Sequence, residues 1–222
     1  FNAAFIPSYV AAKSRSEQTG KKFADEVLSI LILILFFIVL LVEIFTPYVV
    51  YLIAPGFLDN VEKFDFAVEL TRITFPFLLL VSISSFFSGI LNANNKFAAA
   101  AAAPIILNVV LIASLIISFF FDLEFAKQLS YGVTLAGLIQ LLFLIYVTLK
   151  FYKPDLVFNL KLSSKVKFFF KKLLPSILSS GVTQINILVG TIIASFQSGA
   201  VSYLYYADRV YQINLAIAGI AV

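Results

Sequence analysis

The sequence has no cysteine, histidine, methionine or tryptophan. Without cysteine or histidine, the chain cannot form a disulfide, a metal site built on thiolate or imidazole ligands, or a catalytic triad that uses histidine. It also lacks a glycine-rich phosphate loop and a pair of carboxylates at catalytic spacing, so neither ATP-driven transport nor hydrolytic chemistry is expected of this chain. We therefore predict a protein that is not an enzyme and that binds no cofactor or metal.

Charge is scarce as well. Only 13% of the 222 residues are charged and 61% are hydrophobic, whereas a soluble domain has about 25% charged residues. Most apolar side chains must therefore face lipid or other apolar helices, which indicates an integral membrane protein in a phospholipid bilayer. No basic aromatic groove accompanies the many phenylalanines, so nucleic acid is not an expected partner.

Six apolar segments are long enough to cross a bilayer as helices, which takes about 20 residues. They cover residues 27–51, 66–91, 98–121, 129–151, 168–196 and 200–222, and a partial segment covers residues 1–12. A transmembrane β-barrel would show shorter alternating segments instead. The predicted fold is an all-α polytopic membrane protein, with about six transmembrane helices plus a partial one.

Two features favour a segment of a longer polytopic protein. The sequence has no initiator methionine and starts within an apolar segment, and the last span has no basic residue after it. We therefore expect further N- and C-terminal helices of the same protein to be partners of this chain.

The distribution of basic residues predicts the topology. The connections at residues 13–22, 92–96 and 150–172 carry twelve lysines and arginines together, whereas the three connections that alternate with them carry two. Basic connections stay in the cytoplasm, so the first three connections are predicted to be cytoplasmic. The composition changes most sharply in the 150–172 connection, which places the predicted domain boundary there.

Arg209 lies well inside the last apolar span, where a charge is costly unless it lines a cavity or has a partner. It shares one helical face with Ser202, Tyr205, Tyr206 and Gln212. Asp208 is adjacent in sequence, and adjacent residues do not face each other on a helix. Either a phosphate or carboxylate ligand, or an ion pair with another helix, would satisfy the guanidinium.

The fifth span carries a polar stripe at helical spacing, formed by Ser176, Ser180, Thr183, Gln184, Thr191, Ser195 and Ser198. Such a stripe must face protein or water. It fits either a water-filled pathway or hydrogen bonding between helices.

Two charged residues lie in the outer half of other spans, and each has two possible roles. Arg72 could pair with Glu69 or reach the outer surface, and Glu43 could line a cavity or pair with Arg72.

Several short motifs occur in a fixed order along the chain. They are Phe5-Ile6-Pro7, Ala54-Pro55-Gly56-Phe57, the segments 71–77, 89–93 and 103–108, Ala194-Ser195, and the segment 202–209 that ends in Tyr-Tyr-Ala-Asp-Arg. In order and spacing they resemble the MurJ/MviN family, the lipid II flippases of bacterial cell-wall (peptidoglycan) synthesis. That family belongs to one superfamily with the MATE multidrug transporters and the polysaccharide flippases.

The resemblance implies a MATE-like fold of two helical lobes around a central cavity, in the bacterial cytoplasmic (inner) membrane. This chain would hold the family's second helix, in part, through its eighth. Residues 1–152 would be the remainder of the N-terminal lobe, 153–172 the cytoplasmic connection between lobes, and 173–222 the start of the C-terminal lobe.

The resemblance also implies a substrate, a lipid-linked disaccharide-peptide that crosses by alternating access while cavity arginines hold its pyrophosphate. Arg209 matches one of these arginines. The further candidate substrate-binding residues are Ser202, Asp208, Tyr205, Gln212, Gln184 and Thr183. Other arginines of the family lie before Phe1, so this segment alone is not expected to transport. Gln212 stands where some members have glutamate, which leaves acid-dependent coupling at this position open.

Two alternatives to a lipid II flippase are a related exporter of another lipid-linked oligosaccharide or a small drug, and a membrane scaffold that transports nothing. A drug exporter should have a more acidic or aromatic lining. A scaffold should pair Arg209 with a carboxylate and enclose no solvated cavity.

Overall fold

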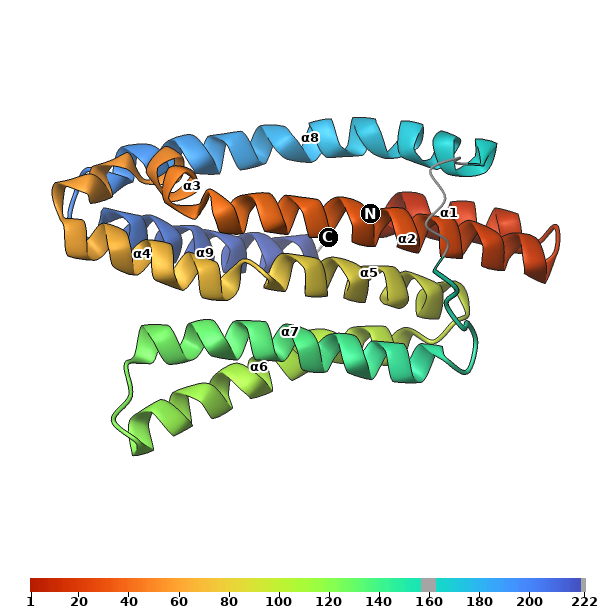
Figure 1. Ribbon diagram of the computed structural model, residues 1–222, viewed down its shortest axis with the longest axis horizontal. Coiled ribbons are helices and arrows are strands. Elements are labelled where there is room, and N and C mark those ends of the chain that lie inside the picture. The colour runs from red at the N-terminus through yellow and green to blue at the C-terminus, as the bar shows by residue number, and fades with distance from the viewer. Residues whose placement is uncertain (157–162, 221–222) are drawn as a thin grey trace. The chain divides into compact units, whose positions relative to one another are not determined.

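The described chain is built of helices. A computed structural model describes residues 1–156 and 163–220, without the side chains of residues 165, 172, 176, 177, 179, 180, 214 and 216–220. In chain order the helices in Figure 1 are α1 (Asn2–Lys13), α2 (Glu17–Ile44), α3 (Thr46–Ile53), the short 3₁₀ helix η1 (Pro55–Asp59), α4 (Val61–Thr74), α5 (Phe77–Ala93), α6 (Phe97–Phe120), α7 (Phe125–Thr148), α8 (Ser164–Ser195) and α9 (Ala200–Ile220).

These helices coincide with the predicted spans. Among the residues that the structure describes, four helical stretches are long and apolar enough to cross a membrane: Glu17–Ile44, Val61–Ala93, Phe97–Phe120 and Phe125–Thr148. The fifth and sixth predicted spans fall on α8 and α9, and the partial segment falls on α1. The prediction of an all-α polytopic membrane protein is confirmed.

Two prolines divide predicted spans. The span at 27–51 splits where α2 ends at Ile44 and α3 begins one residue before Pro47, and the span at 66–91 splits where Pro76 separates α4 from α5. Proline has no N–H to donate and disfavours helical geometry in the residue before it. Pro104 and Pro175, in contrast, lie inside continuous helices.

The helices group into two compact units. Unit 1 comprises residues 1–44 and 70–176, and unit 2 comprises residues 45–69 and those from 177 onward. Unit 1 contains α1, α2, the end of α4, all of α5, α6 and α7, and the start of α8. Unit 2 contains α3, η1, the first turns of α4, the rest of α8, and α9.

The core of unit 1 is a cluster of phenylalanines where α1, α2, α5 and the start of α8 meet. Phe5, Phe86 and Phe169 are completely buried. The Phe5 ring lies 5.0 Å from the Phe86 ring, and the Phe23 and Phe169 rings meet edge to face at 5.9 Å. Aromatic rings at these distances pack favourably beyond the area they bury.

Helices α5, α6 and α7 pack on one another beside this cluster. At Gly137 of α7, a Cβ atom would lie 2.6 Å from the Phe77 ring of α5, so only glycine permits this approach. Thr134 of α7 donates a hydrogen bond from Oγ1 to the carbonyl oxygen of Ile73 at 2.5 Å. The opposite face of α6 exposes large apolar side chains, which suits contact with lipid; they include Ile105, Val109, Ile112, Phe119 and Phe120.

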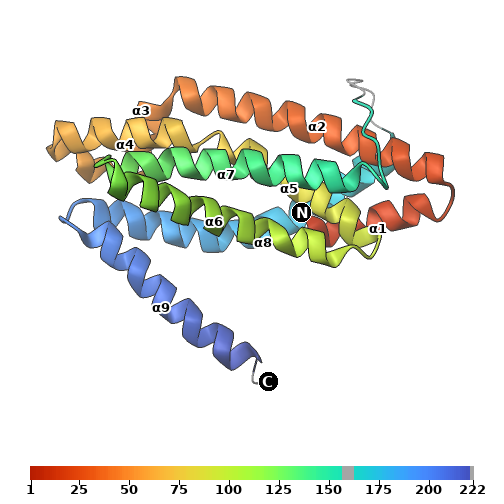
Figure 2. The same cartoon turned by 90° about the horizontal axis from the view of Figure 1, so that it is seen from below.

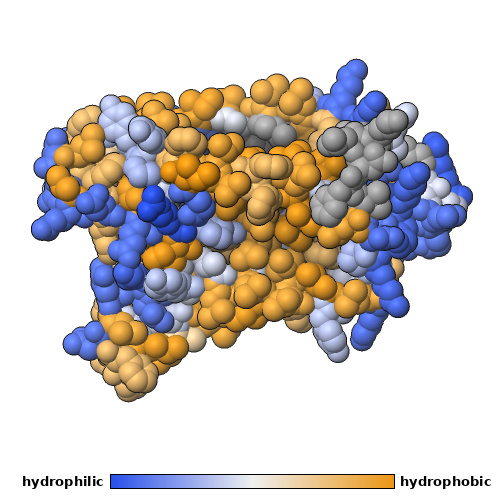
Figure 3. Space-filling view, viewed as in Figure 1, coloured by the Kyte–Doolittle hydropathy of each residue, from blue (hydrophilic) through white to orange (hydrophobic). Residues whose placement is uncertain are grey.

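The three basic connections lie at one end of unit 1. Lys13 donates a hydrogen bond to Asn94 at 2.8 Å, which joins the first connection to the second, and Lys96 lies 5.5 Å from the centroid of the Phe151 ring, which joins the second to the third. Figure 3 shows hydrophilic side chains (blue) at this end of unit 1 and apolar ones (orange) along the middle of its helices. The predicted topology requires these three connections to lie at the same end of the helices, and in unit 1 they do.

Unit 2 is held by a close contact between η1 and the end of α8. The backbone N–H of Gly56 donates to Ser195 Oγ at 3.0 Å, and Ser195 is buried. A Cβ atom on Gly56 would lie 2.5 Å from the backbone of Ser195 and Phe196. Glycine is therefore required where these two segments touch.

Candidate functional site

Arg209 is the centre of a polar group on α9. Its Nη1 donates to Gln212 Oε1 at 3.2 Å, and Gln212 Nε2 in turn donates to Asp208 Oδ2 at 2.6 Å. The residues are three and four positions apart, which places their side chains on the same side of a helix. As expected from their adjacency, Asp208 and Arg209 do not pair directly; Gln212 connects them.

Tyr205 completes this group. The guanidinium carbon of Arg209 lies 4.8 Å from the centroid of the Tyr205 ring, one helical turn earlier. Stacking on an aromatic ring fixes the plane of a guanidinium and leaves its N–H donors at the edge. The side chain is thus held by its own helix in an orientation that can present a donor pair to an oxyanion.

The α9 group is open. Arg209, Asp208, Tyr205, Gln212 and Ser202 are all exposed in the structure. Over the described residues, the contacts of the Arg209 side chain are with its own helix, so an ion pair with another helix is not formed there. The guanidinium therefore remains accessible to an anionic ligand.

The predicted polar stripe on α8 divides into two kinds of residue. Thr183 and Gln184 are exposed, Thr191 donates to the carbonyl oxygen of Ile187 at 2.9 Å, and Ser195 is buried against Gly56. The side chains of Ser176 and Ser180 lie outside the described residues. Ser195 therefore serves packing, whereas Thr183 and Gln184 are exposed, and the water-filled pathway stays a prediction for these two positions.

The turn between the two helices determines how α9 leaves α8. Gly199 in this turn has a φ of +75°, a value that favours glycine. Beyond it α9 runs back along α8 and diverges from it (Figure 2). No hydrogen bond joins Thr183 or Gln184 to the Arg209 group among the side chains that the structure describes.

Cysteine labelling tests whether the open part of the stripe faces water. Because the chain has no native cysteine, single replacements Thr183→Cys and Gln184→Cys report on one position each. A membrane-impermeant maleimide should label both in the assembled protein. Ser195→Cys replaces a residue that is buried against Gly56, so it should be labelled at least about tenfold more slowly. Equal protection at all three positions would contradict a solvated pathway along α8.

Arg72 lies at the end of α4, in unit 1. Its charge is close enough to interact with the Glu43 carboxylate near the end of α2. A mutual electrostatic interaction, one of the alternatives for these two residues, is therefore present, and the alternatives with Glu69 and with the outer surface stay predictions. Such an interaction lowers the cost of placing either charge within a span.

Comparison with known proteins decides the family. The family model described as lipid II flippase MurJ matches residues 1–222. The chain belongs to the MurJ family. The resemblance inferred from the short motifs is therefore confirmed.

Relatives and a solved structure agree with this assignment to the MurJ family. Proteins named probable lipid II flippase MurJ from Rhizobium tropici and Rickettsia prowazekii (strain Madrid E) are 38% and 39% identical to the chain, over 100% and 98% of its length. A structure described as lipid II flippase MurJ in an inward closed conformation matches 96% of the chain with a TM-score of 0.77 and 26% identity. The chain spans 43% of the length of each of these proteins.

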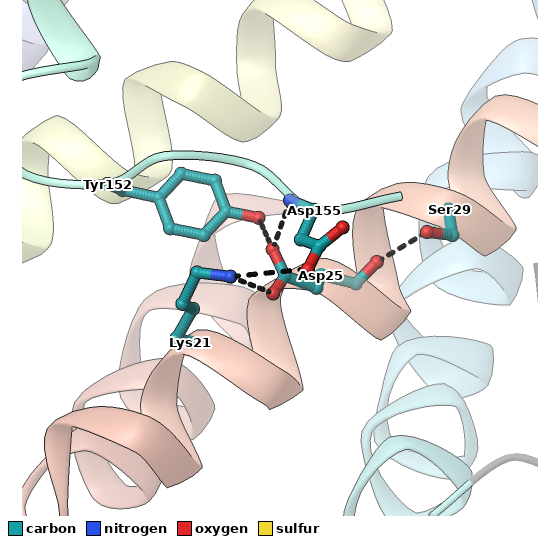
Figure 4. Close-up of polar contacts among 5 residues, drawn as sticks. All are labelled: Lys21, Asp25, Ser29, Tyr152 and Asp155. Carbon is teal, nitrogen blue, oxygen red and sulfur yellow. Dashed lines mark hydrogen bonds and ion pairs between the residues drawn. The ribbon is translucent and has the colours of Figure 1, made fainter. Parts of the chain in front are cut away.

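A second polar cluster of this MurJ-family chain lies at the end of unit 1 that carries the basic connections. Asp25 of α2 is buried and accepts hydrogen bonds at Oδ1 from the Tyr152 hydroxyl at 2.5 Å and from the Asp155 backbone N–H at 3.0 Å (Figure 4). Lys21 Nζ lies 3.0 Å from Asp25 Oδ2. A buried carboxylate is tolerated only when donors surround it in this way.

Tyr152 acts as a donor in this cluster. Burial, and then the hydrogen bond to Asp25, raise the pKa of its hydroxyl far above the usual range. The proton therefore stays on the oxygen at any physiological pH. Sequence patterns do not reveal the pairing, because Asp25 and Tyr152 are 127 residues apart; the only sequence signal is an aspartate on the apolar side of a basic connection.

Proposed function

We propose that the complete protein containing this chain flips lipid II across the bacterial cytoplasmic membrane by alternating access. The family assignment supports this function, and the observation that carries it is the open guanidinium of Arg209, stacked on Tyr205 and adjacent to Gln212. A lipid-linked pyrophosphate is a multiply charged oxyanion that suits such a donor pair. No covalent bond has to change in such a transfer, so the site needs only to bind the headgroup and release it.

Gln212 gives this site a way to exchange partners. In the structure the Arg209 guanidinium donates to the Gln212 amide oxygen, a neutral acceptor. A pyrophosphate oxygen is charged and accepts a stronger hydrogen bond, so it would displace Gln212, which remains bound to Asp208. Ser202, two turns before Arg209, and Thr183 and Gln184 on α8 would contribute further polar contacts as the headgroup crosses.

The proposal includes an orientation in the membrane. The connections at 13–22, 92–96 and 150–172 would face the cytoplasm, since they hold twelve of the fourteen basic residues that the six predicted connections carry. Residues 1–152 would form the remainder of the N-terminal lobe, 153–172 the connection between lobes and 173–222 the start of the C-terminal lobe. Helices contributed by the rest of the protein would complete the cavity.

Complementation tests the function. Cells depleted of their own lipid II flippase should be rescued from lysis by a gene that encodes the complete protein with this chain, and lipid II should again reach the outer face of the membrane. Expression without rescue, together with lipid II retained on the inner face, would contradict the proposal. Rescue of export of a different lipid-linked oligosaccharide, with no effect on lipid II, would instead support the related-exporter alternative.

A further inference from the structure

We propose that Asp25 and Glu26 of α2 form a carboxylate clamp that fixes the connection between α7 and α8 to unit 1, so that the start of α8 follows α2 during transport. The clamp itself is independent of the substrate; its importance for transport rests on the proposed function. Its residues lie at the end of unit 1 that carries the basic connections, since Asp25 bonds to Tyr152 and Asp155 in the 150–172 connection.

The first half of the clamp holds the start of the connection. Asp25 is 4% exposed, and its Oδ1 accepts from both the Tyr152 side chain and the Asp155 backbone N–H. Tyr152 is 4% exposed and packs its ring 6.0 Å from the Phe86 ring in the core. The chain that leaves α7 is therefore tied to α2 by one side chain and one backbone group (Figure 4).

The second half holds the end of the connection. Glu26 Oε2 accepts a hydrogen bond from the backbone N–H of Ser163 at 3.2 Å. Ser163 directly precedes α8, which begins at Ser164. Two consecutive carboxylates on one helix thus accept backbone N–H groups from both sides of residues 157–162.

Packing extends the attachment into α8. Val166 and Phe169 are completely buried, and the Phe169 ring meets the Phe5 ring of α1 edge to face at 6.3 Å. A connection that was only a flexible tether would need neither the buried Asp25 carboxylate nor the buried Val166 and Phe169 side chains. The contacts instead make the position of α8 at this end depend on α2.

Charge makes the clamp stronger than a neutral one. Hydrogen bonds to an ionised carboxylate are about twice as strong as those between neutral groups. Lys21 Nζ, 3.0 Å from Asp25 Oδ2 and 3.9 Å from Asp155 Oδ2, offsets the negative charge of both carboxylates. The Lys21 side chain is partly exposed, so its ammonium group stays in contact with solvent whether or not Asp25 is charged.

Hydrogen exchange of the complete protein in detergent tests the clamp without reference to transport. In Asp25→Asn and Glu26→Gln variants, the backbone amides of Asp155 and Ser163 respectively should exchange at least about tenfold faster, as expected when a protecting hydrogen bond to a charged acceptor is lost. Tyr152→Phe, which keeps the buried ring, should raise exchange at Asp155 by a smaller factor. Glu17→Gln, an exposed carboxylate of the same helix, is the matched control and should change neither amide.

A transport measurement on the same variants completes the test. The double variant of Asp25→Asn and Glu26→Gln should flip lipid II at least about tenfold more slowly while it still binds lipid II as the wild type does. Unchanged exchange at both amides would overturn the clamp, and faster exchange with normal flipping would overturn its role in transport. If the wild-type protein flips no lipid II, the proposed function fails, and the exchange rates still decide whether the clamp exists.

Discussion

Replacing Arg209 by alanine is expected to abolish lipid II flipping by the complete protein, and replacing it by lysine is expected to slow flipping at least about tenfold. The guanidinium is held by Tyr205 and Gln212 so that two donors can meet one oxyanion. Each hydrogen bond to a charged group is worth about 1.5–3 kcal/mol, so losing two of them weakens pyrophosphate binding by about 100-fold or more. Lysine keeps the charge but loses the fork and the stacking.

Binding and transport should be measured together for these variants. Native mass spectrometry with lipid II, and with a neutral lipid of the same chain length, separates pyrophosphate recognition from lipid contacts. Arg15→Ala, which removes an exposed positive charge from the first basic connection, is the control and should keep nearly full activity. If Arg209→Ala binds and flips lipid II like the wild type, Arg209 does not contact the pyrophosphate.

Replacing Phe5 by alanine is expected to destabilise the protein by about 3–5 kcal/mol, the usual cost of emptying a buried phenylalanine site. Phe5 is completely buried and its ring contacts the rings of Phe86, Phe23 and Tyr9. These partners come from three helices, so the cavity cannot close by the movement of one side chain. The expected loss is larger than for any exposed position of unit 1.

Thermal unfolding in detergent measures this loss. The midpoint should fall by about 10 °C, since each 1 kcal/mol shifts the transition of a protein of this size by about 2–4 °C. Phe36→Ala removes the same side chain from a position on α2 that is 54% exposed, and it should change stability by less than about 1 kcal/mol. Equal shifts for the two variants would contradict a core centred on Phe5.

Local sequence patterns predicted the helices but not all of their ends. Long apolar runs with little charge gave the spans, because a lipid-exposed backbone must satisfy its hydrogen bonds within the helix. Hydropathy predicts one continuous span across Pro47, because the residues on both sides of it are mostly apolar. A hydropathy pattern does not respond to the backbone N–H that proline lacks, so it does not predict the break between α2 and α3. Pro104 shows the converse, because α6 continues through it.

The candidate site was predictable as far as it depends on spacing within one helix. Arg209, Gln212 and Tyr205 share a face because of helical periodicity, and the structure joins them. Contacts between distant segments could not be predicted in this way. Ser195 belongs to the polar stripe by sequence, yet it accepts a hydrogen bond from the Gly56 backbone, and Asp25 meets Tyr152 only because the connection after α7 folds against α2. Such pairs follow from tertiary packing, which a periodic pattern does not encode.

Reconstitution of the complete protein into vesicles tests the central claim most directly. Fluorescent lipid II is placed in the inner leaflet, and its arrival in the outer leaflet is followed over time for the wild-type protein and for Arg209→Ala. We predict transfer by the wild-type protein well above that of empty vesicles, and transfer by Arg209→Ala no faster than in empty vesicles. Transfer at the rate of empty vesicles by the wild-type protein, or equal transfer by both proteins, would contradict a flippase that holds its substrate through Arg209.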